Sequence, residues 1–215
     1  MKKFAVIIAG SGVFDGAEIH EATLTLLAIK KLGADYEIFA PDIPQHHVIN
    51  HMTGEEMHEK RNVLVESARI ARGNIKSLSH FKADMFDAII LPGGFGVAKN
   101  LCTWAFEGDD CSVNPDIEKA IKGMYTAGKP IGAMCISPII LGKLFQGTNV
   151  TTGNDKASAD FIKRMGSDYT EATHGEVIID TTRKIFTTPC YMLDADIVQI
   201  AEGTENLVME MMKCM

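Results

Sequence analysis

Short apolar runs alternate with segments of helical periodicity along nearly the whole chain. The clearest apolar runs predict buried strands at residues 4–9, 36–40, 86–91 and 131–134. The spacing of apolar positions predicts helices at residues 17–32, 61–72, 114–128, 155–165 and 194–215. Buried strands that are each followed by a helix predict parallel β-α-β units, with both faces of the sheet covered. We therefore expect one α/β domain over residues 1–215.

Residues at the ends of these segments support the assignment. Gly33 and Gly73 each follow the last periodic position of a helix, where glycine adopts the left-handed conformation. Asn114-Pro115-Asp116 predicts a helix start, with Asn114 as N-cap. Two short apolar runs, residues 177–180 and 185–187, flank a polar turn and predict a hairpin.

Composition narrows the function classes. Of the 215 residues, 46% are hydrophobic and 23% are charged, as in an ordinary globular protein. A net charge of −7 argues against non-specific binding to nucleic acid or to an anionic membrane surface. The first apolar run stops at Gly10, too early for a secretory signal, and no run is long enough to span a membrane. The 5 cysteines contain no C-x-x-C pair, so we expect reduced thiols and a cytoplasmic protein.

Cys135 is the strongest candidate for a chemical role. Small and apolar residues lead into it, and Pro138 follows three places later, as at the start of a helix. A strand that turns sharply into a helix would place the thiol beside free backbone N–H groups and the positive end of the helix dipole. These groups lower a thiol's pKa and can hold an oxyanion. The alternative is a buried core cysteine.

Two glycine-rich segments follow predicted strands. Residues 10–16 resemble a dinucleotide-binding loop, but the third glycine falls one place late, so a tight turn is the alternative. In residues 92–96, Gly93 and Gly94 can expose their N–H groups and supply half of an oxyanion hole facing Cys135.

Carboxylates and histidines offer partners for the thiol. Asp15 and Glu18 have the spacing of a capping box, and Glu18 could instead point its carboxyl group at Cys135. His174-Gly175-Glu176 follows Cys135 in the order seen in glutaminases, although a loop histidine is the simpler interpretation. The histidines at 46, 47 and 51 lack the spacing of metal ligands, so we expect no metal.

Several motifs occur together in one order along the chain. They are residues 11–21, 48–55, 61–64, 91–96, 98–101, 134–136 and 187–189. In this combination the chain resembles the ElbB branch of the DJ-1/PfpI superfamily, the isoprenoid-biosynthesis proteins with an amidotransferase-like domain. The resemblance covers nearly the whole sequence.

The resemblance implies a flavodoxin-like three-layer sandwich of the class I glutamine amidotransferase kind, with a cysteine on a nucleophile elbow. It implies a catalytic pair that maps onto Glu18 and Cys135. It also implies a glyoxalase or deglycase activity without glutathione or other cofactor, and a homodimer. Ile136 occupies the position where PfpI-type proteases have histidine, so we expect no peptidase activity, and the resemblance gives His174 no role.

We therefore predict an enzyme that converts small dicarbonyls such as glyoxal to hydroxy acids. Cys135 would attack the aldehyde and Glu18 would transfer protons. The backbone of Gly93, Gly94 and Ile136, together with Asn100, would bind the substrate. Two alternatives remain: a glutaminase-like amidotransferase subunit that uses Cys135 with His174 and Glu176, and a redox sensor in which Cys135 oxidises to a sulfinic acid.

Overall fold

The computed structural model describes all 215 residues and contains a seven-stranded sheet in the order β3-β2-β1-β4-β5-β9-β8. The strands are β1 (Lys3–Ile7), β2 (Asp35–Ala40), β3 (Lys76–Ser77), β4 (Ala88–Leu91), β5 (Ile131–Met134), β8 (Ile178–Asp180) and β9 (Ile185–Thr188). Every neighbouring pair is parallel except β8 and β9, which form the predicted antiparallel hairpin. The predicted, mostly parallel α/β sheet is confirmed.

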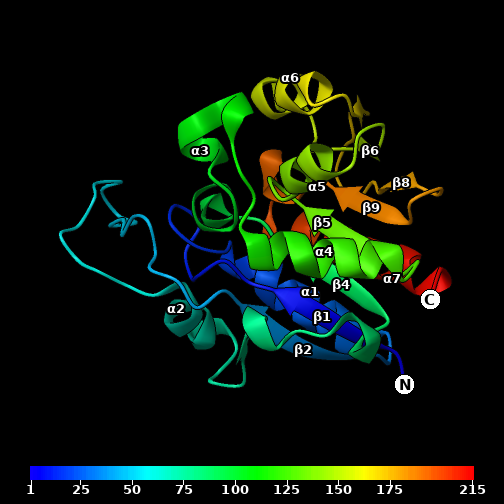
Figure 1. Cartoon of the computed structure of the whole chain (residues 1–215), viewed down its shortest axis with the longest axis horizontal. Helices are drawn as coiled ribbons and strands as arrows, with labels where there is room; N and C mark the ends of the chain where they lie inside the picture. Colours follow the sequence, from blue (N-terminus) through cyan, green and yellow to red (C-terminus); the bar gives the residue numbers. More distant parts are fainter.

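Helices cover both faces of this sheet. The seven are α1 (Ile19–Lys31), α2 (Val63–Ile70), α3 (Trp104–Glu107), α4 (Pro115–Thr126), α5 (Pro138–Leu144), α6 (Lys156–Arg164) and α7 (Ile197–Lys213). Figure 1 shows α4 in front of the strands, with α1 and α7 packed against each other behind them. The chain is therefore the flavodoxin-like three-layer sandwich expected from the resemblance. Strands β6 (Asn149–Val150) and β7 (Asp168–Tyr169) form a small separate sheet.

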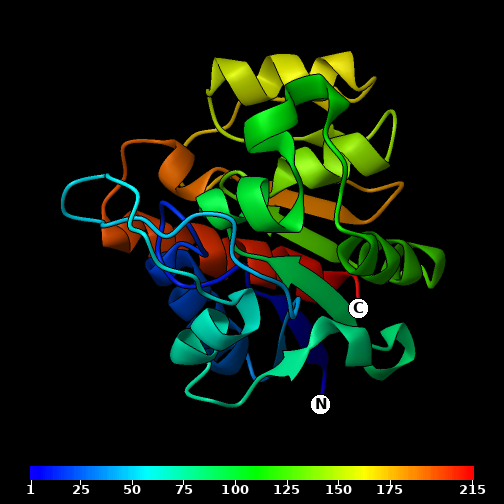
Figure 2. The same cartoon turned by 60° about the vertical axis from the view of Figure 1, so that its left-hand side comes forward.

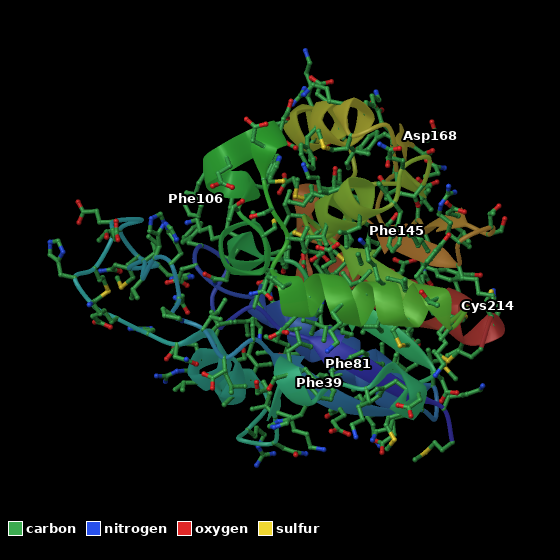
Figure 3. All side chains as sticks on the ribbon, in the orientation of Figure 1. Phe39, Phe81, Phe106, Phe145, Asp168 and Cys214 are labelled. Atoms are coloured by element: carbon green, nitrogen blue, oxygen red, sulfur yellow. The ribbon has the colours of Figure 1, made fainter.

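The core lies between these layers. All of β4 and β5 is buried, as expected for central parallel strands. Phe39 on β2 is buried and meets the rings of Phe81 and Phe86 edge-on, with centroids 5.6 and 5.5 Å away. Figure 3 shows Phe39 and Phe81 together at the edge of the sheet that carries β2.

Two of the local signals for helix ends are confirmed, whereas several helix starts lie later than predicted. Gly33 and Gly73 have φ values of 78° and 80°, and the Asn114 side chain caps α4. Helix α2 begins at Val63 instead of residue 61, α7 at Ile197 instead of residue 194, and α1 at Ile19 instead of residue 17. Residues 12–17 close into a turn in which Gly12 N–H donates to the Ala17 carbonyl at 2.9 Å. Of the two interpretations of residues 10–16, the structure therefore shows the tight turn.

The topology brings three loops to one edge of the sheet. Strand β1 pairs with β2 on one side and with β4 on the other, and β5 follows β4. The loops after β1, β4 and β5 therefore leave neighbouring carboxyl ends, where open α/β sheets bind ligands. Residues 41–62 form a long excursion from the sheet, which both views show extending away from the body (Figures 1 and 2).

None of the helices is both long and apolar enough to cross a membrane.

Candidate active site

Cys135 stands at a strained bend directly after β5. Its φ is 57°, in the left-handed region that residues with a Cβ rarely adopt. The bend is held by the Cys135 N–H, which donates to the Thr188 carbonyl at 3.0 Å, and by Ser137 Oγ, which donates to the Pro92 carbonyl at 2.7 Å. Helix α5 then begins at Pro138. The predicted strand-turn-helix setting of Cys135 is therefore present, and strain of this kind gathers at functional sites.

The carboxyl group beside this thiol belongs to Glu21. It lies in the first turn of α1 and is fully buried. Its Oε2 accepts a hydrogen bond from Gly93 N–H at 2.9 Å, and its Oε1 accepts one from Tyr191 N–H at 3.2 Å. The Cys135 side chain is also hydrogen-bonded to the Glu21 carboxyl group. Glu21 and Cys135 thus form a buried pair.

The sequence-based choice of Glu18 for this place is corrected by the structure. Glu18 is the N-cap of α1, and its Oε2 accepts a hydrogen bond from Glu21 N–H at 2.7 Å. The capping residue predicted from the sequence, Asp15, instead accepts from Ile49 N–H at 2.6 Å. Because the helix starts about one turn later than the capping-box spacing suggested, the residue at the thiol is also one turn later.

Burial makes Glu21 a weak acid. The pKa of Glu21 rises to about 8, mainly because burial removes the carboxyl group from water and also because the charge of Glu18 is nearby. The hydrogen bonds from the N–H groups of Tyr191 and Gly93 lower the pKa but do not offset this rise. At neutral pH Glu21 is therefore mostly a neutral carboxylic acid. Above pH 8 it becomes a carboxylate that can accept the thiol proton.

The pKa of Cys135 is raised, whereas the sequence predicted that it would be lowered. Burial is the largest cause, and the charge of an ionised Glu21 is the second. The N–H groups of Gly94 and Ile136 hydrogen-bond to the sulfur and act in the opposite direction. The sequence signal identified these N–H groups but could not show that the thiol is almost completely buried, at 6% exposure. A thiolate at Cys135 would therefore have to form by proton transfer to Glu21.

The glycine loop after β4 contributes differently from the prediction. The Gly94 N–H faces the sulfur, together with that of Ile136, as expected for an oxyanion hole. Gly93 instead gives its N–H to Glu21. A Cβ on Gly93 would overlap the Cys135 Cβ and lie 2.8 Å from its sulfur. Gly93 therefore serves as a spacer that admits the thiol, and the oxyanion role predicted for its N–H is wrong.

Asn100 is not available to substrate. Its Nδ2 donates to the carbonyls of Ala9 and Asp15, at 3.1 and 3.0 Å, and its Oδ1 accepts from His46 N–H at 3.0 Å. With its donors and acceptor used in this way, the side chain ties the loop after β1 to residues 45–47. The substrate-binding role predicted for Asn100 is corrected to a structural one.

Cys135 opens into a cavity of about 220 Å³. Its walls are mostly apolar and include Phe95, Trp104, Ile136 and Met192, and its polar side chains are those of Asp155 and Tyr191. The Tyr191 hydroxyl lies 2.8 Å from His20 Nδ1. No sequence motif singled out Tyr191 or Asp155, but Tyr191 follows the motif at residues 187–189, and the order of β5 and β9 could have placed it here.

The histidines named from the sequence lie elsewhere. His174 is exposed and lines a separate pocket with Glu171 and Leu193, and the cavity at Cys135 has no histidine in its wall. The Glu176 carboxylate accepts from Thr173 N–H at 2.6 Å, within its own loop. The Cys-His-Glu arrangement of the glutaminase alternative is therefore not assembled.

Nor do the histidines at 46, 47 and 51 converge on a metal site. His46 stacks on Phe106 with ring centroids 4.0 Å apart, and His51 Nε2 accepts from Phe14 N–H at 3.2 Å. The structure contains no cluster of histidine, cysteine and carboxylate side chains that could hold a metal ion.

Comparison with known sequences connects this site to a family. The sequence model of the DJ-1/PfpI family matches residues 11–191. The human "Glutamine amidotransferase-like class 1 domain-containing protein 3, mitochondrial" is 41% identical over 221 residues, covering 98% of this chain and 82% of the human protein. The "ES1 protein, mitochondrial" of Danio rerio is 32% identical over 228 residues, covering 97% and 84% of the two chains.

Solved structures agree on the fold. The "isoprenoid biosynthesis protein with amidotransferase-like domain" of Ehrlichia chaffeensis superposes with a TM-score of 0.92 at 34% identity, covering 99% of this chain and 100% of that one. The Rapid Encystment Protein of Francisella tularensis reaches a TM-score of 0.65 at 15% identity, covering 100% and 99%, and it supports the fold alone.

Proposed function

The chain belongs to the DJ-1/PfpI family. We propose that it is a glutathione-independent glyoxalase. It would convert glyoxal-type dicarbonyls to hydroxy acids, as free compounds or as early sugar-aldehyde adducts. The observation that carries the proposal is the buried Glu21–Cys135 pair beside two backbone N–H donors, in a cavity with no histidine in its wall. The pair supplies a nucleophile and a proton carrier without a cofactor.

The first step forms a bond between sulfur and carbon. An ionised Glu21 takes the Cys135 proton, and the thiolate attacks one aldehyde carbon of glyoxal. The N–H groups of Gly94 and Ile136 hold the oxyanion that develops on that carbon. Glu21 then returns the proton to this oxygen, which completes a hemithioacetal and leaves Glu21 ionised again.

The second step moves hydrogen between the two carbons. Glu21 removes the proton from the sulfur-bearing carbon, and the electron pair forms an enediolate with the neighbouring carbonyl. Glu21 returns that proton to the neighbouring carbon, and the hydroxyl proton of the sulfur-bearing carbon moves to the oxygen of the neighbouring carbon, which gives the thioester of glycolic acid. One carbon is oxidised and the other is reduced, so no external oxidant is needed. Water then hydrolyses the thioester, releases glycolate and restores the thiol.

The size of the cavity supports this substrate class. At about 220 Å³ it is smaller than the roughly 300–1,000 Å³ typical of drug-sized ligands. A two- or three-carbon dicarbonyl fits such a space. Apolar walls exclude water, which protects the enediol and strengthens the hydrogen bonds to the oxyanion.

The redox-sensor alternative has one observation in its favour. The N–H groups that face the sulfur could equally hold the oxygen atoms of an oxidised Cys135. Mass spectrometry of protein treated with hydrogen peroxide, with and without turnover measurement, separates the two: a sensor oxidises at Cys135 without showing any dicarbonyl activity.

Turnover tests the proposal directly. Purified protein is incubated with glyoxal or methylglyoxal, and the hydroxy acid is quantified by NMR. We expect product with wild type and none with Cys135→Ala. Absence of hydroxy acid from wild type above the uncatalysed background would refute the proposal, and ammonia release from glutamine would support the amidotransferase alternative.

Assembly and compartment remain predictions. We propose a homodimer, which light scattering would test. The cytoplasmic location predicted from the cysteines also needs a direct test, because the human and Danio rerio relatives are named as mitochondrial.

A further inference from the structure

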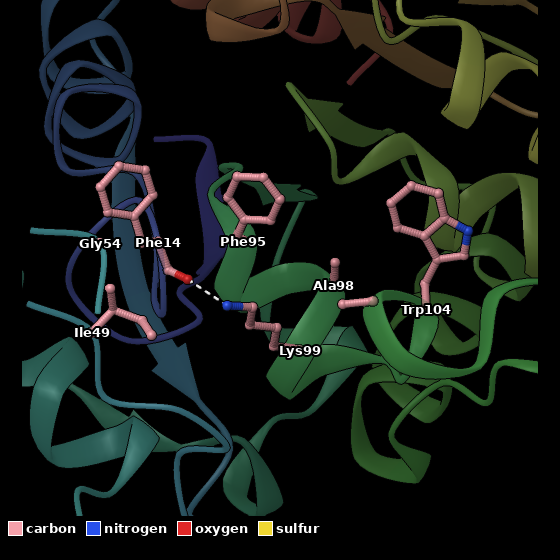
Figure 4. Close-up of a pocket in the computed structure, with 8 residues that line it drawn as sticks. Phe14, Ile49, Gly54, Phe95, Ala98, Lys99 and Trp104 are labelled. Atoms are coloured by element: carbon pink, nitrogen blue, oxygen red, sulfur yellow. Dashed lines mark hydrogen bonds between the residues drawn. The ribbon is translucent and has the colours of Figure 1, made fainter. Parts of the chain in front are cut away.

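A second cavity adjoins the one at Cys135. Its volume is about 570 Å³, and it shares Phe95 and Trp104 with the smaller cavity. Phe14 and Ile49 form its opposite wall, from the loop after β1 and from the excursion after β2 (Figure 4). A molecule bound here could therefore extend from the reactive sulfur past Trp104 and Phe95.

The walls of this second cavity offer apolar surface to solvent. Phe14 is 39% exposed and Phe95 is 49% exposed, although both are large aromatic side chains. Exposed aromatic groups around a hollow are typical of sites that bind an apolar part of a ligand.

Lys99 brings a positive charge into this apolar setting. Its Nζ donates to the Phe14 carbonyl at 2.8 Å and lies 5.8 Å from the centre of the Phe95 ring (Figure 4). Partial burial lowers the pKa of Lys99, and the charges of Asp15 and Glu56 act in the opposite direction. An ammonium group has three donors, so two remain for a ligand.

The backbone fixes the position of this lysine. Lys99 lies in the π-helical turn Val97–Leu101, and the neighbouring Asn100 anchors that turn to the Ala9 and Asp15 carbonyls. Turns of this kind recur at functional sites. The ammonium group is thus held on a rigid support instead of on a flexible surface loop.

We infer that Lys99 binds a carboxylate at the far end of the substrate, with the apolar body of the substrate lying between Phe14, Phe95 and Trp104. The substrate class is then an α-oxoaldehyde joined to a ring or short chain that ends in a carboxylate. The assignment of the aldehyde end to Cys135 rests on the proposed function, whereas the carboxylate site is a separate claim about binding.

Binding of a carboxylate at Lys99 can be tested with compounds that cannot react with Cys135. Trp104 is the only tryptophan in the chain and lines both cavities, so its fluorescence reports ligand binding. Phenylacetate carries a ring and a carboxylate, and phenylacetamide is its neutral counterpart; neither has an aldehyde. We expect wild type to bind phenylacetate about tenfold more tightly, as for one charge-assisted contact.

Matched variants assign this preference to Lys99. We expect Lys99→Met to abolish the difference between the two probes. Lys119→Met, at an exposed position on α4, should preserve it. Equal binding of the two probes by wild type, a preference that survives in Lys99→Met, or no binding of either probe by fluorescence and equilibrium dialysis would each overturn the inference.

Turnover provides a second test. The ratio of kcat/KM for 4-carboxyphenylglyoxal to that for phenylglyoxal should fall about tenfold in Lys99→Met and stay unchanged in Lys119→Met. If no dicarbonyl is turned over but phenylacetate is still preferred, the proposed function fails and the carboxylate site stands. If glyoxal is turned over but neither assay shows dependence on charge, the carboxylate site fails and the proposed function stands.

Discussion

The Gly93 N–H donates to Glu21 Oε2 at 2.9 Å, and this hydrogen bond joins the loop after β4 to the first turn of α1. Gly93 also leaves room for the Cys135 side chain, which any Cβ at this position would displace. One glycine thus orients the Glu21 carboxyl group and leaves room for the Cys135 thiol. The chemistry of the site depends on these two elements meeting across the carboxyl edge of the sheet.

Substitutions of Glu21 and Glu18 should have different effects on activity and stability. Glu21→Gln removes the proton carrier and should lower kcat by about 10²–10⁴-fold, the range for general acid–base catalysis. Glu18→Gln keeps a side-chain oxygen that can cap α1 but loses the negative charge, so it should lower stability by no more than about 1 kcal/mol and keep kcat within a few-fold of wild type. Glyoxal kinetics and thermal melting of both variants provide the measurement.

Because Glu21 accepts two backbone hydrogen bonds, an amide in its place could disturb the local fold. Glu21→Asp keeps the acid but shortens its reach, and it should retain more activity than Glu21→Gln at equal or lower stability. Loss of activity in Glu18→Gln without loss in Glu21→Gln would contradict this assignment of roles.

The rate of reaction should rise with pH through about 8. Below this value Glu21 is protonated and cannot take the thiol proton; above it, the pair holds one proton that can move between carboxylate and thiolate. We expect kcat/KM for glyoxal to increase along the alkaline limb with an apparent pKa near 8 that belongs to the pair. A rate that is flat from pH 6 to 9 would contradict the role given to Glu21.

The free energy of unfolding should fall as pH rises, whereas the reaction rate should increase. Folding raises the pKa of Glu21 from 4.5 to about 8, so the folded protein holds this proton more tightly than the unfolded chain. The stabilisation is fully present below pH 4.5 and is lost as pH rises through 8. It amounts to a few kcal/mol, since one pKa unit corresponds to about 1.4 kcal/mol. Urea unfolding from pH 5 to 9 should show this decline in wild type and a smaller one in Glu21→Gln.

The sequence predicted the fold well because the relevant signals are local. The central strands are continuous apolar runs, and residues such as Gly33 and Asn114 mark helix ends through their own conformational preferences. The bend at Cys135 was predictable for the same reason, since the run into the cysteine and Pro138 lie within eight residues of each other.

The partner of the thiol was not predictable in this way. Glu18 and Glu21 lie one helical turn apart, so their assignment depends on where α1 begins. That start is set by a turn closed through backbone hydrogen bonds, such as that from Gly12 to Ala17, which leave no side-chain pattern. The raised pKa of Cys135 depends on burial by segments that are distant in the sequence. The position of Lys99 in a cavity with Phe14 and Trp104 likewise depends on the fold and could not be predicted from the residues around Lys99.

Gly93→Ala should abolish activity. The added Cβ would overlap that of Cys135, which is held by backbone and cannot move aside. Gly33→Ala is a control for the added methyl group: no atom lies within 4 Å of the added Cβ, although Gly33, unlike Gly93, has a positive φ and the substitution therefore strains its backbone. It should cost about 1 kcal/mol of stability and leave activity intact. Equal activity in Gly93→Ala and wild type would show that the close approach at Cys135 is not required.

His174→Ala should keep dicarbonyl turnover within a few-fold of wild type. The reason is geometric: His174 is exposed in a separate pocket, and Glu21 occupies the position of the base at Cys135. The amidotransferase alternative predicts the reverse, since its thiol would depend on a histidine. Glyoxal turnover and ammonia release from glutamine, measured side by side for wild type and His174→Ala, distinguish the two. A large loss of dicarbonyl turnover in the variant, together with ammonia released from glutamine by wild type, would contradict the proposed function and support the amidotransferase alternative.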